Sequence, residues 1–589
     1  MPKAGTVAFP AYRPDLTDLG TDISVMISGV LPQGDGYGPF KDFVAFTAAL
    51  PANCRGFFFA RRGDGSIAVF AGTSERLYLL DNTTFEWADV SKGGVAYGAL
   101  VTDKNWKFAQ FNEFVVATQV NTVPQKYVLT AGPTFIDLAG SPPQAGQVAV
   151  VNRFLMLTEL LSNPRRTQWS DLDAPETWMA GVGLADYQDF PDGGICHAIS
   201  GGDAYGVVFQ DEAIRSLTYA PGSAVVFQIS RISTQDTLFA EYSVINAGTR
   251  TFFLSSQGFK VIVAGGEPAS IGKEYVDKFF FEDVDRNSLQ LVIGVADPAG
   301  TRVGWAYKSQ QGDAGLFDKI LWFDWSIKDR PWSIVPMSGQ YLGYLARPGL
   351  TLEALDFIAP GTIAISNVTN VGGFMALTVA SIARVSGPAP ADGAPTETEL
   401  QVNDRIAVGQ VTGTGGMPAA INVGNITITN ISGAGPYVLT TNVAFVGAYT
   451  SGGMIAGSID ALPFSLDSIS TAAAASLAAV GPTGALGFFT GSNIEAVLET
   501  SEQDADGPFV FIVALAPMTD SADAMCSVGY RMTAQEAISY TAETQVTSNG
   551  DCPQLIEAKF AKARLRIPAG STWRYARGIK PEVSAAGTY

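Results

Sequence analysis

Short runs of apolar, β-branched and aromatic residues recur along most of the chain, separated by Gly, Asp, Asn and Pro. Examples are SIAVFAGT at 66–73, EFVVATQ at 113–119 and QVAVVNRFLMLTE at 147–159. Such runs are typical of β-strands bounded by turns, and long stretches with helical periodicity are scarce. Short helical turns are expected only at Thr533–Ile538 and in the Ala-rich stretch 472–479. The pattern therefore predicts an all-β protein.

The strand-like runs group into units of roughly 35–45 residues, the usual length of one four-stranded propeller blade. Several units begin with an apolar strand, pass a tight turn and end on an aromatic-rich strand. The predicted units are Gly56–Val90, Trp106–Leu138, Gln147–Met179, Ile195–Ile232, Glu241–Gly272 and Leu289–Val335. This spacing favours a β-propeller of about six or seven blades over a series of β-sandwiches.

Residues 358–460 interrupt this pattern, because aromatic residues become rare and Thr, Val, Ile, Gly and Asn alternate as in half-exposed strands. We interpret them as a small β domain inserted into the propeller, after which ALGFFTG (485–491) and AVLETS (496–501) return as blade strands. The predicted parts are an N-terminal arm and platform part at 1–50, the propeller at 51–357 and 461–515, the inserted domain at 358–460, and a C-terminal platform part at 516–589.

Composition narrows the class of protein. Charged residues make up 16 % of the chain, against about 25 % in an average protein, and 63 Gly and 32 Pro supply many turns. With 37 Lys and Arg against 56 Asp and Glu, the formal charge is −19. Because phosphates are held by Lys and Arg, such a chain is a poor nucleic-acid binder, although an acidic wall can surround DNA without gripping it.

The ends and the cysteines exclude other classes. The N-terminus has no apolar signal-peptide core, and no run of 18 apolar residues exists, so we expect a soluble protein made inside a cell, without a membrane span. The cysteines match no zinc pattern and no CxxC motif, and they are too few for a disulfide-stapled secreted fold. These cysteines are Cys54, Cys196, Cys526 and Cys552.

Catalytic candidates are sparse. His197 is the only histidine, and its neighbour Cys196 would point to the opposite face of a strand, so a nucleophile–base pair is not expected. Paired carboxylates of a glycosidase remain open, but no Ser-x-Asp-x-Gly-x-x-Trp repeat is present. No Walker loop exists, and Gly413–Gly416 reads as a loop of the inserted domain.

Two acidic segments begin like calcium loops. Asp283, Asp285 and Asn287 have the right start, but Ser288 replaces the turn glycine and Gly294 the bidentate acid. A second segment, Asp504 and Asp506, fails in the same way at Pro508. Both are therefore interpreted as solvated loop acids.

Two further motifs have a structural interpretation. Arg62-Gly63-Asp64 copies a cell-attachment tripeptide, but its surroundings are those of a hairpin turn. Trp322, Trp325 and Trp332 on one hairpin could stack sugars or bases, but packing between blades is favoured.

Several stretches resemble one phage family. They are TRTFFLSSQGFKVIVAGGEPASIGKEYVDKFFFEDVD (249–285), GVADPAGTRVGWAY (294–307), RRTQWSDLDAPETW (165–178), DKILWFDWSIKDRPWSIV (318–335), the N-terminal FPAYRPDLTDLG and the closing RLRIPAGSTWRYARGI. The chain resembles the tail nozzle, or tail tubular protein B, of short-tailed bacteriophages and the related packaged-DNA stabilisation hub proteins. The inserted domain resembles a small β-barrel module of phage tail proteins, marked by Asp404-Arg405 and Tyr449–Gly453.

The resemblance implies a structural protein of the virion, not an enzyme, assembled in the host cytoplasm into the phage tail. It implies a homo-hexamer around the DNA exit channel, with a propeller and a platform that both chain ends build. The implied partners are adaptor or portal-side tail proteins, tail fibres and the enclosed double-stranded DNA, which is not read by sequence. No catalytic, cofactor-binding or metal-binding residue is predicted. The alternative is a tail-tip or surface propeller that binds or hydrolyses host glycans.

Overall fold

The computed structural model describes residues 5–82, 84–347, 363–382, 400–402, 405–422, 426–456, 474–505 and 509–585. Regular structure in these ranges is almost entirely β-strand, as predicted. The helical segments are short: α1 (Asp277–Asp283), α3 (Met417–Ile421) and the 3-10 turns η1 (Lys92–Gly94), η2 (Glu241–Ser243) and η3 (Leu289–Leu291). None of these helices has the length and apolarity needed to span a bilayer.

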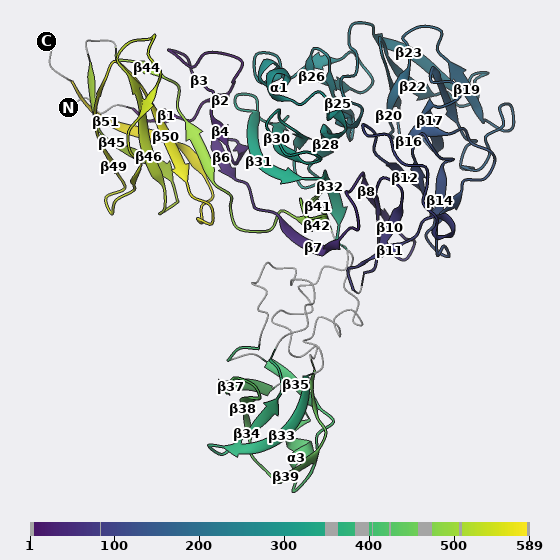
Figure 1. Ribbon diagram of the computed structural model, residues 1–589. Helices are drawn as coiled ribbons and strands as arrows, with labels where there is room; N and C mark the ends of the chain where they lie inside the picture. Colours follow the sequence, from purple (N-terminus) through teal and green to yellow (C-terminus); the bar gives the residue numbers. More distant parts are fainter. Residues whose placement is uncertain are drawn as a thin grey trace.

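Four-stranded antiparallel units follow one another along the first half of the chain (Figure 1). The first three comprise β8 (Phe57–Arg61), β9 (Ile67–Gly72), β10 (Leu77–Leu80) and β11 (Trp87–Asp89); β12 (Lys107–Phe111), β13 (Phe114–Thr118), β14 (Gln125–Val128) and β15 (Ile136–Asp137); and β16 (Ala145–Val151), β17 (Phe154–Leu160), β18 (Arg166–Trp169) and β19 (Asp186–Asp189). The next three comprise β20 (Cys196–Ser200), β21 (Gly206–Gln210), β22 (Ile214–Tyr219) and β23 (Phe227–Ser233); β24 (Ile245–Ala247), β25 (Arg250–Ser255), β26 (Gly258–Val263) and β27 (Ala269–Ser270); and β28 (Ile293–Ala296), β29 (Arg302–Tyr307), β30 (Phe317–Asp324) and β31 (Trp332–Gly339).

Each predicted unit overlaps one of these six. The third prediction, Gln147–Met179, ends before β19 because a long loop with Asp, Pro and Gly separates β18 from its outer partner. The first strands of successive units contact one another, and η2, which precedes β24 in the chain, contacts β20 and β28. The ring is completed by β32 (Tyr341–Ala346), which contacts both β28 and β8. The units therefore close into a ring, and the protein is a β-propeller, as predicted.

One more four-stranded unit is assembled from distant parts of the chain. Its order is β32 (Tyr341–Ala346), β41 (Ala475–Val480), β42 (Ala485–Phe488) and β7 (Val44–Ala49). β7 thus belongs to the propeller, which corrects the predicted boundary at residue 50. The Ala-rich stretch forms strand β41 instead of a helical turn, because β32 and β42 flank it and pair with its backbone. Ala346 pairs directly with Ala475, so the chain leaves and re-enters this unit at adjacent positions.

The inserted segment forms a closed barrel, as predicted. Its order is β33 (Ile363–Val371), β34 (Phe374–Val379), β38 (Tyr437–Ala444), β37 (Ile426–Ser432), β35 (Arg405–Gly409) and β40 (Met454–Ala456), and a smaller sheet pairs β36 (Thr412–Thr414) with β39 (Ala448–Ser451). Alternating Ile, Val, Leu and Met side chains fill its own core, which is distinct from those of the propeller. In the motif Tyr449–Gly453, the Tyr449 hydroxyl donates a hydrogen bond to Gly452 O at 2.8 Å. In the motif Asp404-Arg405, Asp404 lies outside the described residues.

Both chain ends build the platform, where the two termini lie together (Figure 1). One sheet has the order β49 (Cys552–Ala558), β45 (Val510–Thr519), β51 (Ala576–Ala585), β6 (Gly36–Pro39) and β5 (Val30–Gln33), with β1 (Val7–Ala8) on β51. The other continues from β31 through β4 (Ile27–Ser28), β43 (Ala496–Glu499), β50 (Phe560–Ile567), β46 (Met525–Arg531) and β47 (Ser539–Tyr540). Short pairs complete it: β44 (Gln503–Asp504) on β50, β48 (Thr544–Gln545) on β46, and β2 (Ala11–Tyr12) with β3 (Ile23–Ser24).

The platform differs from the prediction in two respects. β43 and the first part of β45 fall in the range 461–515, assigned to closing propeller strands, but both strands pair with platform strands. Thr533–Ile538 forms a turn between β46 and β47 and not a helical turn. The platform is also continuous with the propeller, since Ser28 of β4 pairs with Ile334 of β31 and Gly29 N donates to Ile334 O at 2.9 Å.

Candidate functional site

Two ionic networks, the first partly buried and the second with a deeply buried ion pair at its centre, are the most unusual chemistry of this molecule. The first, here called the axial network, consists of Arg55, Lys104, Asn105, Glu159, His197 and Glu241. Most of these residues directly precede, or begin, the first strand of a propeller unit: β8, β12, β20 or, through η2, β24. Because these strands surround the propeller axis, the network gathers residues of several units at one end of the axis.

Lys104 is the centre of the axial network. Its Nζ atom lies 2.6 Å from Glu159 Oε1 and 2.5 Å from Glu241 Oε1. His197 continues the chain of contacts, with Nδ1 3.3 Å from Glu241 Oε1 and Nε2 2.5 Å from Asp211 Oδ1. Four of the propeller units are therefore joined by side chains as well as by packing.

Asn105 extends the contacts to the remaining neighbours. Its backbone N–H donates to Tyr242 Oη at 2.7 Å, and its Nδ2 donates to the Gln290 carbonyl at 2.8 Å. Arg55 Nε donates to Asn105 Oδ1 at 2.9 Å, and Arg55 Nη2 donates to Thr102 O at 2.8 Å. Propeller units that are far apart in the sequence are thus held together at one point.

Burial shifts the titration of this network. Desolvation, with Glu241 close by, raises the pKa of Glu159 to about 6, although Lys104 opposes the shift. The pKa of His197 is raised because its ring bonds to Glu241 and Asp211. Burial also lowers the pKa of nearby Lys107 to about 8. The Oε2 atoms of Glu159 and Glu241 are buried without a hydrogen-bond partner in the described structure, which fits the reluctance of Glu159 to ionise.

The backbone at Glu159 is also unusual. Its φ of +56° lies in the left-handed region, where a residue other than glycine is uncommon. Opposite it stands Gly146, and a Cβ there would lie 1.9 Å from Glu159 Oε2. The carboxylate therefore occupies space that only a glycine leaves free.

The axial network predicts a pH-dependent stability. The folded pKa of Glu159 exceeds its ordinary value, so its contribution to stability falls as pH rises from about 4.5 to 6. The raised pKa of His197 gives a contribution that is present below about pH 6.5 and lost as pH rises through the folded value. We expect the urea midpoint of the propeller to be lower at pH 7.5 than at pH 5.5.

The variant His197→Gln isolates the histidine. It should show a smaller fall of the urea midpoint between the two pH values, because Asp277, whose pKa burial raises to about 6, and Glu159 still titrate in it. An identical fall in the variant and the unmodified protein would contradict the role assigned to His197.

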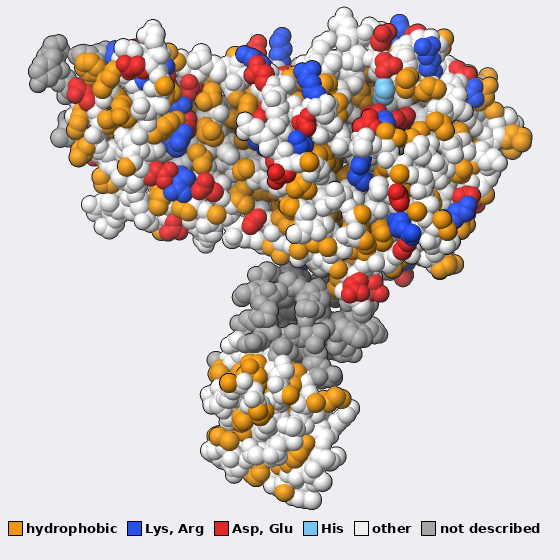
Figure 2. Space-filling model, in the orientation of Figure 1, with side chains coloured by type: hydrophobic (Ala, Val, Ile, Leu, Met, Phe, Trp, Pro, Cys, Tyr) orange, Lys and Arg blue, Asp and Glu red, His pale blue; other side chains and the backbone are white. Residues whose placement is uncertain are grey.

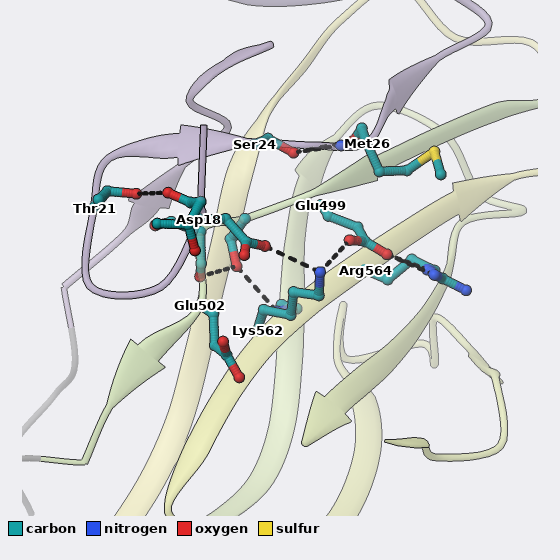
Figure 3. A network of polar contacts seen from close by, with 12 residues as sticks. Asp18, Thr21, Ser24, Met26, Glu499, Glu502, Lys562 and Arg564 are labelled. Atoms are coloured by element: carbon teal, nitrogen blue, oxygen red, sulfur yellow. Dashed lines mark hydrogen bonds and ion pairs between the residues drawn. The ribbon is translucent and has the colours of Figure 1, made fainter. Parts of the chain in front are cut away.

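The second network, here called the platform network, ties the N-terminal arm to the platform (Figure 3). Lys562 Nζ on β50 lies 3.1 Å from Asp18 Oδ2 and 2.8 Å from Glu499 Oε2. Glu499 Oε1 accepts from Arg564 Nε at 2.6 Å and from Tyr540 Oη at 2.8 Å. The side chains of Glu499 and Lys562 are only 2 % and 4 % exposed.

Charge pairing keeps both groups ionised. Burial alone would raise the pKa of Glu499, but Lys562, Tyr540 and Arg564 hold it below its ordinary value. Burial alone would lower the pKa of Lys562, but Glu499 and Asp18 raise it. A buried ion pair with its remaining bonds satisfied fixes geometry, and removing one partner leaves a costly unpaired charge.

The residues that the sequence offered as candidates for catalysis or metal binding have structural roles in the fold. Cys196 is fully buried in the core between two propeller units, while the His197 ring points to the axial network, so the two side chains are separated as predicted. In the first acidic segment, Asp283 binds Lys319 Nζ at 2.7 Å and Asp285 binds Lys308 Nζ at 2.9 Å. Each of these two carboxylates is thus paired with a lysine of the propeller.

The second acidic segment is partly outside the described residues, which include Asp504 but not Asp506 or Pro508. Asp504 Oδ1 lies 2.8 Å from Lys559 Nζ. Within the described ranges no group of three or more His, Cys, Asp or Glu side chains is placed to hold a metal ion.

The tripeptide Arg62-Gly63-Asp64 forms the turn between β8 and β9. Arg62 Nη1 donates to Ser66 Oγ at 3.2 Å and Nε to Leu129 O at 3.3 Å, while Asp64 Oδ1 accepts from Ser66 N at 2.8 Å. Both charged groups thus stabilise the hairpin. Gly413–Gly416 leads from β36 into α3 of the barrel.

Two of the three tryptophans pack inside the protein, and Trp325 is partly buried. Trp322 and Trp332 are 1 % and 0 % exposed, in two different cores. Trp325 stacks on Phe252 with ring centres 5.4 Å apart. The favoured interpretation, packing rather than a stacking platform for ligands, is confirmed for Trp322 and Trp332.

Sequence reasoning missed the two networks. The available signal was an acid in an otherwise apolar strand, such as Glu159 in FLMLTEL or Glu499 in AVLE. Such a residue is buried only when it is paired. The partners, Lys104 and Lys562, lie far along the chain and carry no comparable signal.

No protein-family model matches the chain, and no curated protein matches it. Among solved structures, similarity is found to a functionally unknown protein from Desulfotomaculum acetoxidans, at 13 % identity and a TM-score of 0.33 over 52 % of this chain and 98 % of that one. A quinonprotein alcohol dehydrogenase-like protein from Bacteroides thetaiotaomicron gives 11 % identity and a TM-score of 0.28 over 47 % and 65 % of the two chains.

The β-propeller domain of Cps50 (Swd1) from Myceliophteria thermophila gives 9 % identity and a TM-score of 0.27 over 46 % of this chain and 96 % of that one. At such values the similarity says nothing about activity, and the fold follows from the strand pairing itself.

Proposed function

We propose that the protein is a structural subunit of the tail nozzle of a short-tailed bacteriophage, which forms a ring that retains packaged DNA and provides the channel for its ejection. The observation that carries this proposal is the platform, in which strands from both chain ends share sheets: β1 and β6 with β51, and β4 with β43. This is the arrangement that the resemblance of the propeller and terminal motifs implies.

The architecture suits a part that bears mechanical load. The platform sheet runs directly into the propeller through β4 and β31, so tension passes along backbone hydrogen bonds. The axial and platform networks hold units together that lie far apart in sequence. We assign the protein no catalytic reaction: it acts by holding its shape in a homo-hexameric ring of the phage tail, between adaptor or portal-side proteins and fibres.

The formal charge of −19 sets the expected behaviour toward DNA. Phosphate-binding proteins gain affinity when Lys and Arg release counterions, and a net acidic wall repels the duplex instead. We therefore expect the purified protein to form a closed ring in negative-stain images, yet to leave duplex DNA unshifted in a gel at physiological salt.

A strictly monomeric protein at micromolar concentration, with no ring in phage particles that contain it, would contradict the nozzle. Submicromolar binding of duplex DNA would leave the ring in place but turn the channel wall into a clamp. Saturable binding or cleavage of host capsule or lipopolysaccharide would instead support a glycan-binding or glycan-cleaving propeller.

A further inference from the structure

One end of the inserted barrel carries an exposed surface made mainly of Val, Gly, Phe and Ala. It consists of the turn Val371–Phe374 between β33 and β34 and of Ala444 and Val446–Ala448 beside it, and is here called the barrel tip. Val371, Phe374 and Val446 are 43 %, 45 % and 38 % exposed. The two segments adjoin, because Phe374 pairs with Ala444 and Phe445 N donates to Gly373 O at 2.9 Å.

The described part of the barrel is also almost free of charge. Among its described residues, 363–382, 400–402, 405–422 and 426–456, the sequence contains one charged residue, Arg405. Figure 2 shows acidic and basic side chains scattered over the propeller and the platform, whereas the visible face of the barrel carries neither. The described residues of the barrel thus offer a partner almost no charge to pair with, and none of them is a carboxylate that would repel an anionic phosphate.

The backbone of the turn Val371–Phe374, the first segment of the barrel tip, is largely paired with neighbouring residues. Gly372 and Gly373 have φ values of +63° and +89°, as a two-residue hairpin turn requires, and Val371 pairs with Phe374 across it. Gly373 N donates to Asn370 Oδ1 at 2.9 Å. These peptide groups can therefore leave bulk water without losing their hydrogen-bond partners, which is the condition for entering an apolar medium.

We propose that the barrel tip is a membrane-contact site that inserts shallowly into a phospholipid bilayer. The surface has only three large exposed apolar side chains, which falls far short of the roughly 800 Å² per partner of a stable protein–protein interface. Contact with a bilayer requires a smaller apolar surface, because lipid molecules rearrange around a narrow apolar protrusion.

One barrel tip binds weakly, since even a single fatty chain holds a protein at a bilayer only marginally. Several tips presented together would bind far more tightly through effective concentration. Contact with lipid by a single chain does not depend on the proposed ring, so the two ideas can fail independently.

The test is flotation of the full-length protein with unilamellar phosphatidylcholine vesicles in a sucrose gradient. At a lipid concentration on the order of millimolar, where the weak binding of a single barrel tip is already detectable, we expect the unmodified protein to float with the vesicles, equally at low and high salt. The double variant Val371→Ser/Phe374→Ser should partition at least about tenfold less. The matched control Val263→Ser/Leu555→Ser removes exposed apolar side chains of the propeller and platform, 50 % and 75 % exposed, and should float like the unmodified protein.

Mass photometry of the same samples keeps the outcomes separate. Failure of the unmodified protein to float, or flotation of the tip variant at the unmodified level, would overturn the proposal. The proposal would also be overturned if the tip variant still floated but no longer self-associated, because the barrel tip would then be a contact with a second copy of the chain. Flotation that needs lipopolysaccharide in the vesicles would assign the tip to glycan instead of lipid. A missing ring alone would count against the nozzle and leave the lipid result standing.

Discussion

A protein that lacks residues 1–49 is expected not to fold, in the propeller or in the platform. The missing segment supplies β7 to the last propeller unit, β4 between β31 and β43, and β6 beside β51. It also supplies Phe9 and Tyr37, both fully buried in the shared core. Loss of a large buried aromatic costs about 3–5 kcal/mol, so two of them alone rival the roughly 5–15 kcal/mol that stabilises a domain.

Expression of the truncated protein should give insoluble material. A peptide of residues 1–49, supplied during refolding, should restore soluble protein with a native near-ultraviolet circular dichroism spectrum. The matched control removes only residues 1–6, ahead of β1, and should behave like the full chain. A soluble truncated protein with the native spectrum would show that the propeller closes without β7.

The contrast between β7 and the first six units explains what the sequence can predict. In those units the four strands follow one another, so turn residues and strand lengths mark each unit locally. The last unit joins 44–49 to 341–346 and 475–488, and such pairing at long separation leaves no local signal. The same limit applies to β43, whose sequence suits a blade strand but whose neighbours are β4 and β50.

The chemistry of the two networks was predictable only in part. The separation of the Cys196 and His197 side chains follows from their adjacent positions on a strand. The pairing of Glu159 with Lys104, or of Glu499 with Lys562, follows from the closed ring and the interleaved chain ends, which no local pattern reveals. Buried charges of this kind are established by tertiary structure.

The variant Lys562→Met is expected to destabilise the platform by about 3–5 kcal/mol, the usual cost of breaking a buried ion pair from one side. Methionine removes the ammonium group that lies between Asp18 and Glu499 but keeps the length and apolar character of the stem. Glu499 then remains buried with fewer compensating charges, and the N-terminal arm loses its bond to β50. Hydrogen exchange of the β46 and β50 amides at increasing urea should report the loss.

The second substitution decides whether the loss comes from an unpaired charge. The double variant Lys562→Met/Glu499→Gln leaves no buried carboxylate at position 499, so it should recover part of the stability that Lys562→Met loses. The control Lys278→Met breaks the pair with Glu282, whose side chains are 71 % and 69 % exposed, and exposed pairs contribute little. If the effects instead add, the double variant has a free energy of unfolding lower than that of Lys562→Met by the full amount that Glu499→Gln costs alone. The two residues would then not be coupled, and the platform network would contribute through packing instead of charge.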